Sequence, residues 1–309
     1  IILIDNSESN LYQINAEFER FTSDNPKIIP VLGDCCNLEF VINIFHKEKI
    51  DIIFHAAAYK HVPIVELNPL EGIFNNVFST LQICKFAEIN NVGQILLIST
   101  DKAVRPTNVM GASKRLAELI IQAFAEKNNS TIYSMVRFGN VLGSSGSVVP
   151  IFQSQINSGG PITVTDPNVI RYFMTISEAV QLVIQSIELA KGGDVFLLDM
   201  GDPVLIKDLA SQMIYLSGLK LKSEQEPDGD IEIEYTGLRP GEKLYEELLI
   251  NAKSLPTENK YIYKANEKNI PYDHLMPLIN DLEIYINENK IEKVSNLLSR
   301  LVPEWDKNI

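Results

Sequence analysis

Short runs of β-branched and aromatic residues alternate with amphipathic stretches through the first two hundred residues of this 309-residue chain. Each run is bounded by polar or glycine-containing segments, which is typical of buried parallel strands. This alternation predicts an α/β fold with a doubly wound parallel sheet, whose ligands lie at the carboxyl ends of the strands. The predicted strands are 1–5, 27–32, 51–55, 94–99, 131–138 and 194–199, and the predicted helices are 8–22, 38–47, 69–90, 109–126 and 177–191.

The pattern changes after Met200. A helix at 206–216 is followed by a charged loop at 223–230 and a short strand at 231–235, and the chain ends in helical patterns at 272–288 and 291–301. We therefore predict two lobes. Residues 1–143 with about 176–200 form the main sheet domain, and residues 144–175 with 201–309 form a smaller, discontinuous lobe over the carboxyl edge of the sheet.

Net charge and cysteine content restrict the kinds of binding partner and the cellular setting that the chain can have. A net charge of -13 argues against nucleic acid or a membrane surface as a general partner, since both need basic faces. Three cysteines without metal-ligand spacing predict no metal site and fit a reducing, cytosolic setting. No apolar run approaches the roughly 18–20 residues of a membrane helix, and no signal peptide is visible.

The beginning of the chain lies inside a strand-like run, without an initiator Met. A glycine-rich turn that cradles a pyrophosphate would precede residue 1, so we expect an upstream segment that completes the first strand and this turn. We also expect weak or no activity from residues 1–309 alone.

Small and acidic residues follow the early strands. Asp5 either accepts hydrogen bonds from a ribose diol or caps the next helix. Asp34 either contacts an adenine or turns the chain. The alanines at 56–58 either admit a flat ligand or pack tightly. His55 and His61 are candidate ligand contacts, although a lone histidine is more often structural.

The strongest chemical signal is Ser99-Thr100-Asp101-Lys102 after the fourth strand, followed by Met110 and Lys114 on one face of a helix. In the short-chain dehydrogenase layout, a tyrosine occupies the position of Met110, which cannot transfer a proton. Asp101 can protonate a leaving hydroxyl, and Lys102 can remove a carbon-bound proton if its pKa is lowered. The alternatives are a solvated Asp-Lys pair and a core methionine.

Two arginines are the best anion candidates outside this motif. Arg171 and Arg239 can grip phosphate oxygens bidentately or form ion pairs between the lobes. Asn140 lies on a glycine-containing loop after the fifth strand, where a substrate can lie against the backbone.

Three blocks, at residues 55–63, 99–114 and 137–150, resemble the nucleoside-diphosphate-sugar 4,6-dehydratases of bacterial polysaccharide biosynthesis. Shorter blocks at 171–175, 198–201 and 236–243 extend the resemblance to about residue 303. These proteins are extended short-chain dehydrogenases with a Rossmann-type fold that act on UDP-N-acetylglucosamine. The methionine at 110 is similar to the branch usually found as large membrane-anchored enzymes. The resemblance therefore implies a cytoplasmic location, or the cytoplasmic face of the bacterial inner membrane with an upstream anchor.

The resemblance also implies NAD as cofactor, a UDP-sugar as substrate and a 4-keto-6-deoxy sugar as product. Asp101 is then the acid, Lys102 the C5 base and Thr100 the residue that holds the C4 oxygen, while Met110 leaves the C4 proton without its usual acceptor. The implied cofactor-binding residues are Asp5, Asp34, Cys35, Ala56, Ala57, Ala58, Lys60, Asn75, Ser99 and Lys114. The implied substrate-binding residues are His61, Asn140, Ser147, Arg171, Arg239 and Glu242.

Three other functions stay open on the sequence. A nucleotide-sugar epimerase would share every binding residue, a non-catalytic nucleotide-sugar sensor would explain Met110, and an NAD-dependent alcohol dehydrogenase would release NADH. We also expect a homo-oligomer, with a dimer formed through the helices at 69–90 and 109–126.

Overall fold

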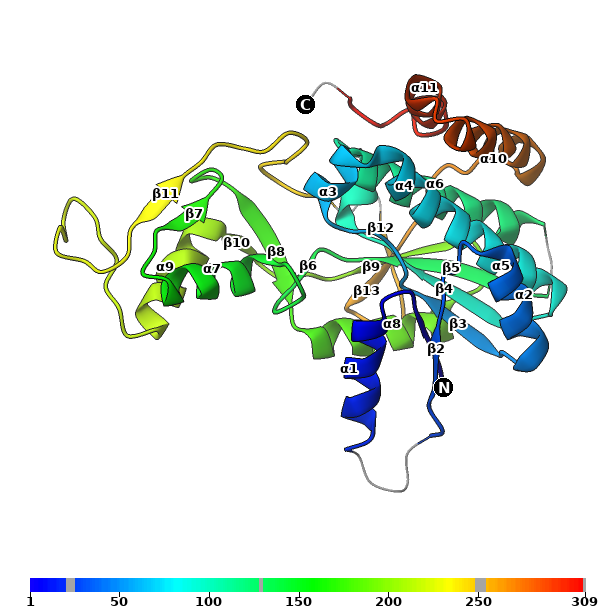
Figure 1. Ribbon diagram of the computed structural model, residues 1–309, viewed down its shortest axis with the longest axis horizontal. Coiled ribbons are helices and arrows are strands. Elements are labelled where there is room, and N and C mark those ends of the chain that lie inside the picture. The colour runs from blue at the N-terminus through cyan, green and yellow to red at the C-terminus, as the bar shows by residue number, and fades with distance from the viewer. Residues whose placement is uncertain (21–25, 128–129, 248–253, 308–309) are drawn as a thin grey trace.

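A computed structural model describes residues 1–20, 26–127, 130–247 and 254–307. A six-stranded sheet forms the main domain, with helices on both faces, and a smaller lobe lies beyond the carboxyl ends of its parallel strands (Figure 1). The strand order is β12-β13-β9-β5-β4-β3. The parallel strands are β3 (Ile52–His55), β4 (Gln94–Ile98), β5 (Ile132–Arg137) and β9 (Asp194–Leu198). The α/β fold and the four strands are confirmed.

Strands β1 (Ile2–Asp5) and β2 (Ile29–Leu32) form a separate parallel pair, joined through α1 (Glu8–Phe18). Among the described residues β4 is the only strand that pairs with β3, so β3 is an edge of the main sheet. Its Ile52 and Phe54 side chains are exposed. The predicted helix at 8–22 ends earlier, and residues 21–25 lie outside the described residues.

The helix predicted at 69–90 is interrupted. It consists of α4 (Pro69–Ile73), a π-helical turn (Phe74–Phe78) and α5 (Ser79–Ile89), and it follows a short helix that we did not predict, α3 (Val62–Leu67). The turn directs Asn76 toward both the loop after β3 and helix α6 (Val109–Glu126). Its side chain accepts a hydrogen bond from Tyr59 N at 2.7 Å and donates one to Ser113 Oγ at 2.9 Å.

Helix α6 (Val109–Glu126) lies at the centre of the molecule. Asn108 caps it by accepting a hydrogen bond from Gly111 N at 2.8 Å, and every residue from Val109 to Phe124 is buried. The reason is that α4 and α5 pack on one side of α6, while α10 (Tyr272–Asn287) and α11 (Ile291–Leu301) cover it from the other (Figure 1). The dimer surface predicted on residues 109–126 is therefore wrong, because the chain's own last helices occupy it. A homo-oligomer remains a prediction.

The last fifty residues differ from the predicted lobe division. Strand β13 (Ile262–Ala265) pairs antiparallel with β9, β12 (Ser254–Pro256) pairs with β13, and α10 and α11 pack on α6. Residues 254–307 thus belong to the main domain and not to the smaller lobe. Helices α2 (Leu38–Lys47) and α8 (Ile176–Leu189) complete the main domain.

Within the described part of the chain, the smaller lobe has two short sheets and two helices around its own core. Its core side chains include Phe152, Ile162, Ile206 and Ile214. The sheets are β10-β8-β6 and β11-β7, formed by β6 (Asn140–Val141), β7 (Ile162–Val164), β8 (Ile170–Met174), β10 (Pro203–Leu205) and β11 (Ile233–Tyr235). The helices are α7 (Val148–Asn157) and α9 (Ile206–Leu216). Because β6 follows β5 directly, the lobe is held at the carboxyl edge of the main sheet.

A buried ionic cluster lies beneath this edge. Arg137, at the end of β5, is fully buried and makes two hydrogen bonds to Glu118 of α6, at 2.6 and 2.7 Å. It makes two more to Glu267, which follows β13, at 2.6 and 2.7 Å. Arg115 bonds Glu118 at 3.1 Å and Glu304 at 2.8 Å. Charge-assisted bidentate pairs of this kind fix both distance and orientation.

The cluster also sets the ionisation of Glu118. Burial raises the pKa of this carboxyl, but Arg137 and Arg115 outweigh burial and lower the pKa to about 2. Its stabilising contribution is complete above the unfolded value of about 4.3 and is lost as the pH falls toward the folded value.

We expect Glu118→Gln to lower the free energy of unfolding by about 3–5 kcal/mol at pH 7, because it leaves buried arginines without their anion. The difference from the unsubstituted protein should shrink as the pH falls from 4 toward 2, and urea unfolding at several pH values measures it. Glu226→Gln, which removes one partner of the exposed Lys220–Glu226 pair, is the control and should cause no measurable loss. Equal behaviour of the two variants would contradict the role given to the cluster.

Candidate active site

A cavity of about 550 Å³ lies at the carboxyl ends of β3, β4 and β5, and residues of both lobes line it. This is the position that a doubly wound sheet favours for ligands. Most predicted site residues line this cavity. They are Ala56, Ala58, Lys60, His61, Ser99, Thr100, Lys102, Met110, Lys114, Asn140, Ser147, Arg171, Arg239 and Glu242.

The loop after β4 is held tightly over the end of β5. Ser99 N donates to Val136 O at 2.8 Å, and Asp101 N donates to Phe138 O at 3.2 Å. A 3-10 turn (Asp101–Ala103) follows, and Thr100 caps it by accepting a hydrogen bond from Lys102 N at 3.3 Å. The Ser99 hydroxyl donates to Glu118 at 2.6 Å, so the buried cluster supports this loop from below.

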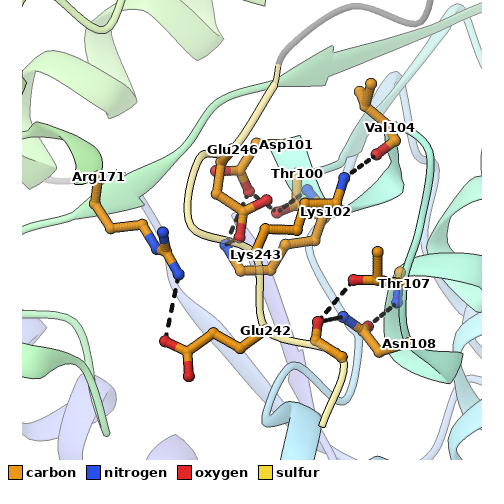
Figure 2. Close-up of polar contacts among 12 residues, drawn as sticks. Thr100, Asp101, Lys102, Val104, Thr107, Asn108, Arg171, Glu242, Lys243 and Glu246 are labelled. Atoms are coloured by element: carbon orange, nitrogen blue, oxygen red, sulfur yellow. Dashed lines mark hydrogen bonds and ion pairs between the residues drawn. The ribbon is translucent and has the colours of Figure 1, made fainter. Parts of the chain in front are cut away.

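Asp101 and Lys102 form a contact that is mostly withdrawn from solvent. The Lys102 ammonium lies 3.0 Å from Asp101 Oδ1, which also accepts a hydrogen bond from Thr100 Oγ1 at 2.8 Å (Figure 2). Asp101 is 3% exposed and lies behind the cavity wall, whereas Lys102 lines it. The alternative of a solvated surface pair is therefore wrong.

Lys102 has a second anionic neighbour that the sequence did not reveal. Glu246 Oε1 lies 3.6 Å from Lys102 Nζ (Figure 2). Burial lowers the pKa of Lys102, but Asp101 and Glu246 outweigh burial and raise the pKa above its ordinary value. The lowered pKa that a base at neutral pH needs is not found in the ligand-free site, so Lys102 is an ammonium there.

Lys114 has the opposite environment. Its amine donates to Ile98 O at 2.8 Å, and burial, opposed by Glu118, lowers its pKa to about 8. Met110, one helical turn earlier, is 3% exposed and contributes a cavity wall, so it is both a core side chain and a site residue. His55 bonds Thr80 at 3.0 Å, and burial and Lys114 lower its pKa to about 3, which makes it a neutral structural residue.

Two arginines line the part of the cavity formed by the smaller lobe. Arg171 donates to Ile170 O at 2.8 Å and to Leu244 O at 3.1 Å, and it contacts Glu242 at 3.4 Å (Figure 2). The guanidinium of Arg239 has no ion pair within the described part of the chain. It is therefore the better placed of the two to bind an anion.

Residues 236–247, which we call the clamp segment, are fastened to the loop after β4. Gly241 O accepts hydrogen bonds from Thr107 at 2.7 Å and from Asn108 at 3.2 Å, and Lys243 donates to Val104 O at 2.9 Å (Figure 2). Gly241 has φ +75°, and a Cβ there would lie 2.9 Å from Thr107 O. Only glycine fits this contact without strain.

In addition to His55, six predicted residues do not line the cavity. Besides Asp101 they are Asp5, Asp34, Cys35, Ala57 and Asn75. Asp34 accepts a hydrogen bond from Cys36 N at 2.7 Å and so stabilises a turn, as its alternative proposed. Asp5 accepts one from Ser7 N at 2.7 Å, but Ser7 and not Asp5 caps α1. Cys35 packs against the main core, and Asn75 donates to Asn76 at 3.0 Å. Their roles in cofactor binding remain predictions.

A family model described as "Polysaccharide biosynthesis protein" matches residues 1–267. The chain belongs to the polysaccharide biosynthesis protein family. Its relatives include the capsular polysaccharide biosynthesis protein CapD of Staphylococcus aureus, which is 45% identical over 96% of this chain and 48% of CapD. They also include a UDP-glucose 4-epimerase of Rickettsia canadensis, 37% identical over 74% of this chain and 64% of the epimerase. The chain thus spans about half the length of CapD.

Solved structures with this fold include Pen from Bacillus thuringiensis, with a TM-score of 0.74 and 33% identity over 91% of this chain and 89% of Pen. DesIV of Streptomyces venezuelae, a dTDP-glucose 4,6-dehydratase solved with NAD bound, has a TM-score of 0.64 and 18% identity over 79% of this chain and 76% of DesIV. At that identity the similarity to DesIV shows the fold alone.

No helix among the described residues is both long and apolar enough to span a membrane. Likewise, no group of three or more His, Cys, Asp and Glu side chains among the described residues is placed to hold a metal ion.

The contrast between the two site lysines can be measured. In a ¹³Cε NMR titration of labelled lysines, we expect Lys114 to titrate near pH 8, against about 10.4 for an ordinary lysine. Its signal is assigned by its loss in Lys114→Arg. Titration of Lys114 together with the bulk of the lysines would contradict the burial-driven shift.

Proposed function

We propose that this family member is an NAD-dependent dehydratase that converts UDP-N-acetylglucosamine to its 4-keto-6-deoxy derivative for polysaccharide biosynthesis. The observation that carries the proposal is the Asp101–Lys102 contact of 3.0 Å beside a methionine in place of the usual tyrosine. An acid and an amine in contact provide the two groups that an elimination needs. A simple alcohol oxidation would need only one proton acceptor.

The residues at the carboxyl ends of the strands fit a dinucleotide cofactor. Ala56 and Ala58 give the cavity a wall of small side chains, and Lys114 brings an amine to the same wall. Ser99 and Lys114 would hold the nicotinamide ribose, and Asp5 and Asp34 the adenosine. When bound, NAD⁺ supplies the acceptor for the hydride of sugar C4 and later returns that hydride to C6.

The chain's own residues move the protons. The Asp101 carboxylate accepts the C4 hydroxyl proton through Thr100, whose hydroxyl donates to it at 2.8 Å. The resulting C4 ketone acidifies the C5 proton, which the neutral Lys102 amine removes. Asp101 then returns this proton through the Thr100 hydroxyl to the C6 hydroxyl, which leaves as water. Lys102 returns a proton to C5 when C6 receives the hydride, so both groups end in their starting states.

The diphosphate and the sugar would lie against the smaller lobe. Arg239 and Arg171 provide the cations for the UDP moiety, and Asn140 and Ser147 line the same cavity. His61 lines the same cavity, where its ring lies against Gly146.

A nucleotide-sugar epimerase is the second candidate, because UDP-glucose 4-epimerases are among the relatives. It would use the same binding residues but would leave the C6 hydroxyl in place. The two reactions therefore differ in the mass of the product.

Incubation of the full-length protein with UDP-N-acetylglucosamine should yield a product lighter by one water. In heavy water that product should carry deuterium at C5, because Lys102 exchanges its proton with solvent. Mass spectrometry and NMR of the sugar read both features. A product of unchanged mass and inverted configuration at C4 would establish the epimerase instead.

Lys102→Arg separates a base from a mere positive charge. Arginine keeps a cation beside Asp101 but does not lose its proton. We expect turnover to fall by about 10²–10⁴-fold, the usual contribution of a positioned base, with substrate affinity within a few-fold by calorimetry. Full activity of Lys102→Arg would exclude Lys102 as the base.

A further inference from the structure

The environment of Glu246 calls for an explanation. Its carboxylate is 6% exposed, and Oε1 lies 3.6 Å from Lys102 Nζ. The other oxygen, Oε2, is buried and makes no hydrogen bond to any described residue. Buried polar atoms are nearly always hydrogen-bonded, so an unpartnered carboxylate oxygen beside a catalytic amine points to a role beyond packing. Figure 2 shows that Glu246 and Asp101 both approach the Lys102 amine.

The proposed reaction needs a group that removes a proton from the Lys102 ammonium. Lys102 begins as an ammonium between two carboxylates, but it must be a neutral amine before it can take the C5 proton. Asp101 cannot accept the lysine proton, because it already receives the C4 hydroxyl proton and delivers it to the C6 hydroxyl. A second carboxylate is therefore required within reach of Lys102, and Glu246 is in that position.

We infer that Glu246 is a positioning residue for Lys102, and that its carboxylate takes the proton which Lys102 must lose before it acts as the base at C5. In this step an N–H bond of Lys102 breaks and an O–H bond of Glu246 forms. Ammonium and carboxylate become amine and carboxylic acid, so the net charge of the pair is unchanged. The proton returns to Lys102 after C5 is reprotonated. The inference rests on the proposed dehydration.

Protonation of Asp101 provides the trigger for this transfer. While Asp101 and Glu246 are both anionic, their charges hold the proton on Lys102. When Asp101 accepts the C4 proton, one of the two anions disappears and the ammonium is less favoured. The lysine thus becomes a base only after C4 has been oxidised, which gives the reaction its order.

The clamp segment links this step to the substrate. It carries Arg239 and Glu242, which line the cavity, and Glu246 lies four residues beyond Glu242 on the same segment. Gly241 and Lys243 fasten the segment to the loop that carries Lys102. A ligand that contacts Arg239 therefore influences where Glu246 lies relative to Lys102.

The test compares Glu246→Gln with Glu247→Gln. Glu247 is the adjacent residue and pairs with exposed Arg105 at 3.5 Å, so it is a matched control. In a ¹³Cε lysine titration without substrate, Glu246→Gln should lower the pKa of Lys102 by about one unit, because one of its two anionic neighbours is gone. Glu247→Gln should leave it unchanged. Equal Lys102 titrations in the two variants would overturn the inference.

The second readout is turnover. For Glu246→Gln we expect kcat at pH 7 to fall at least tenfold at unchanged KM, with recovery as the pH rises. Glu246→Asp, which keeps the carboxylate, should restore part of both the pKa and the rate, and this excludes a loss due to folding. If dehydration occurs and Glu246→Gln has the pH profile of the unsubstituted enzyme, the inference fails alone. If no dehydration occurs, the proposed function fails, and the proton-transfer role fails with it.

Discussion

The paired contacts of Arg137 with Glu118 and Glu267 are the interaction on which the rest of this molecule depends. They join the end of β5, the middle of α6 and the segment after β13 in a region without solvent. A buried ion pair is a weak source of net stability compared with apolar packing, but its directional bonds allow few other arrangements. Here the arrangement also fixes the position of the loop after β4, because the Ser99 hydroxyl donates a hydrogen bond to Glu118.

The chemistry of the site follows from this framework. The β4 loop brings Thr100, Asp101 and Lys102 together, and α6 brings Lys114 to the same wall. The two lysines have different environments. Burial lowers the pKa of Lys114 to about 8 although Glu118 opposes it, whereas Asp101 and Glu246 raise the pKa of Lys102. A site that has methionine instead of tyrosine thus has a carboxylate and an amine in contact on the neighbouring loop.

The sequence predicts those parts of the fold and site that depend on local pattern. The apolar runs identify β3, β4, β5 and β9, and the amphipathic stretch at 109–126 has the bounds of α6. The π-helical turn at Phe74–Phe78 is missed because a helical period does not show an inserted residue. The place of β13 is missed because nothing local in residues 262–265 shows which sheet edge they will join.

Tertiary contacts explain the other misses. Glu246 and Lys102 are far apart in sequence, and an acidic residue beyond the Arg-Pro-Gly block has no local mark that distinguishes it from its exposed neighbour Glu247. The Arg137–Glu118 pair is hidden for the same reason, although an arginine at the end of an apolar strand is itself unusual.

The covering of α6 by α10 and α11 also affects how the chain folds while it is being translated. Arg115 and its partner Glu304 are 189 positions apart, so α6 leaves the ribosome long before the helices that cover it. Until α10 and α11 emerge, the nascent chain carries α6 with an uncovered apolar face, which makes folding of the main domain dependent on the translation of these two helices.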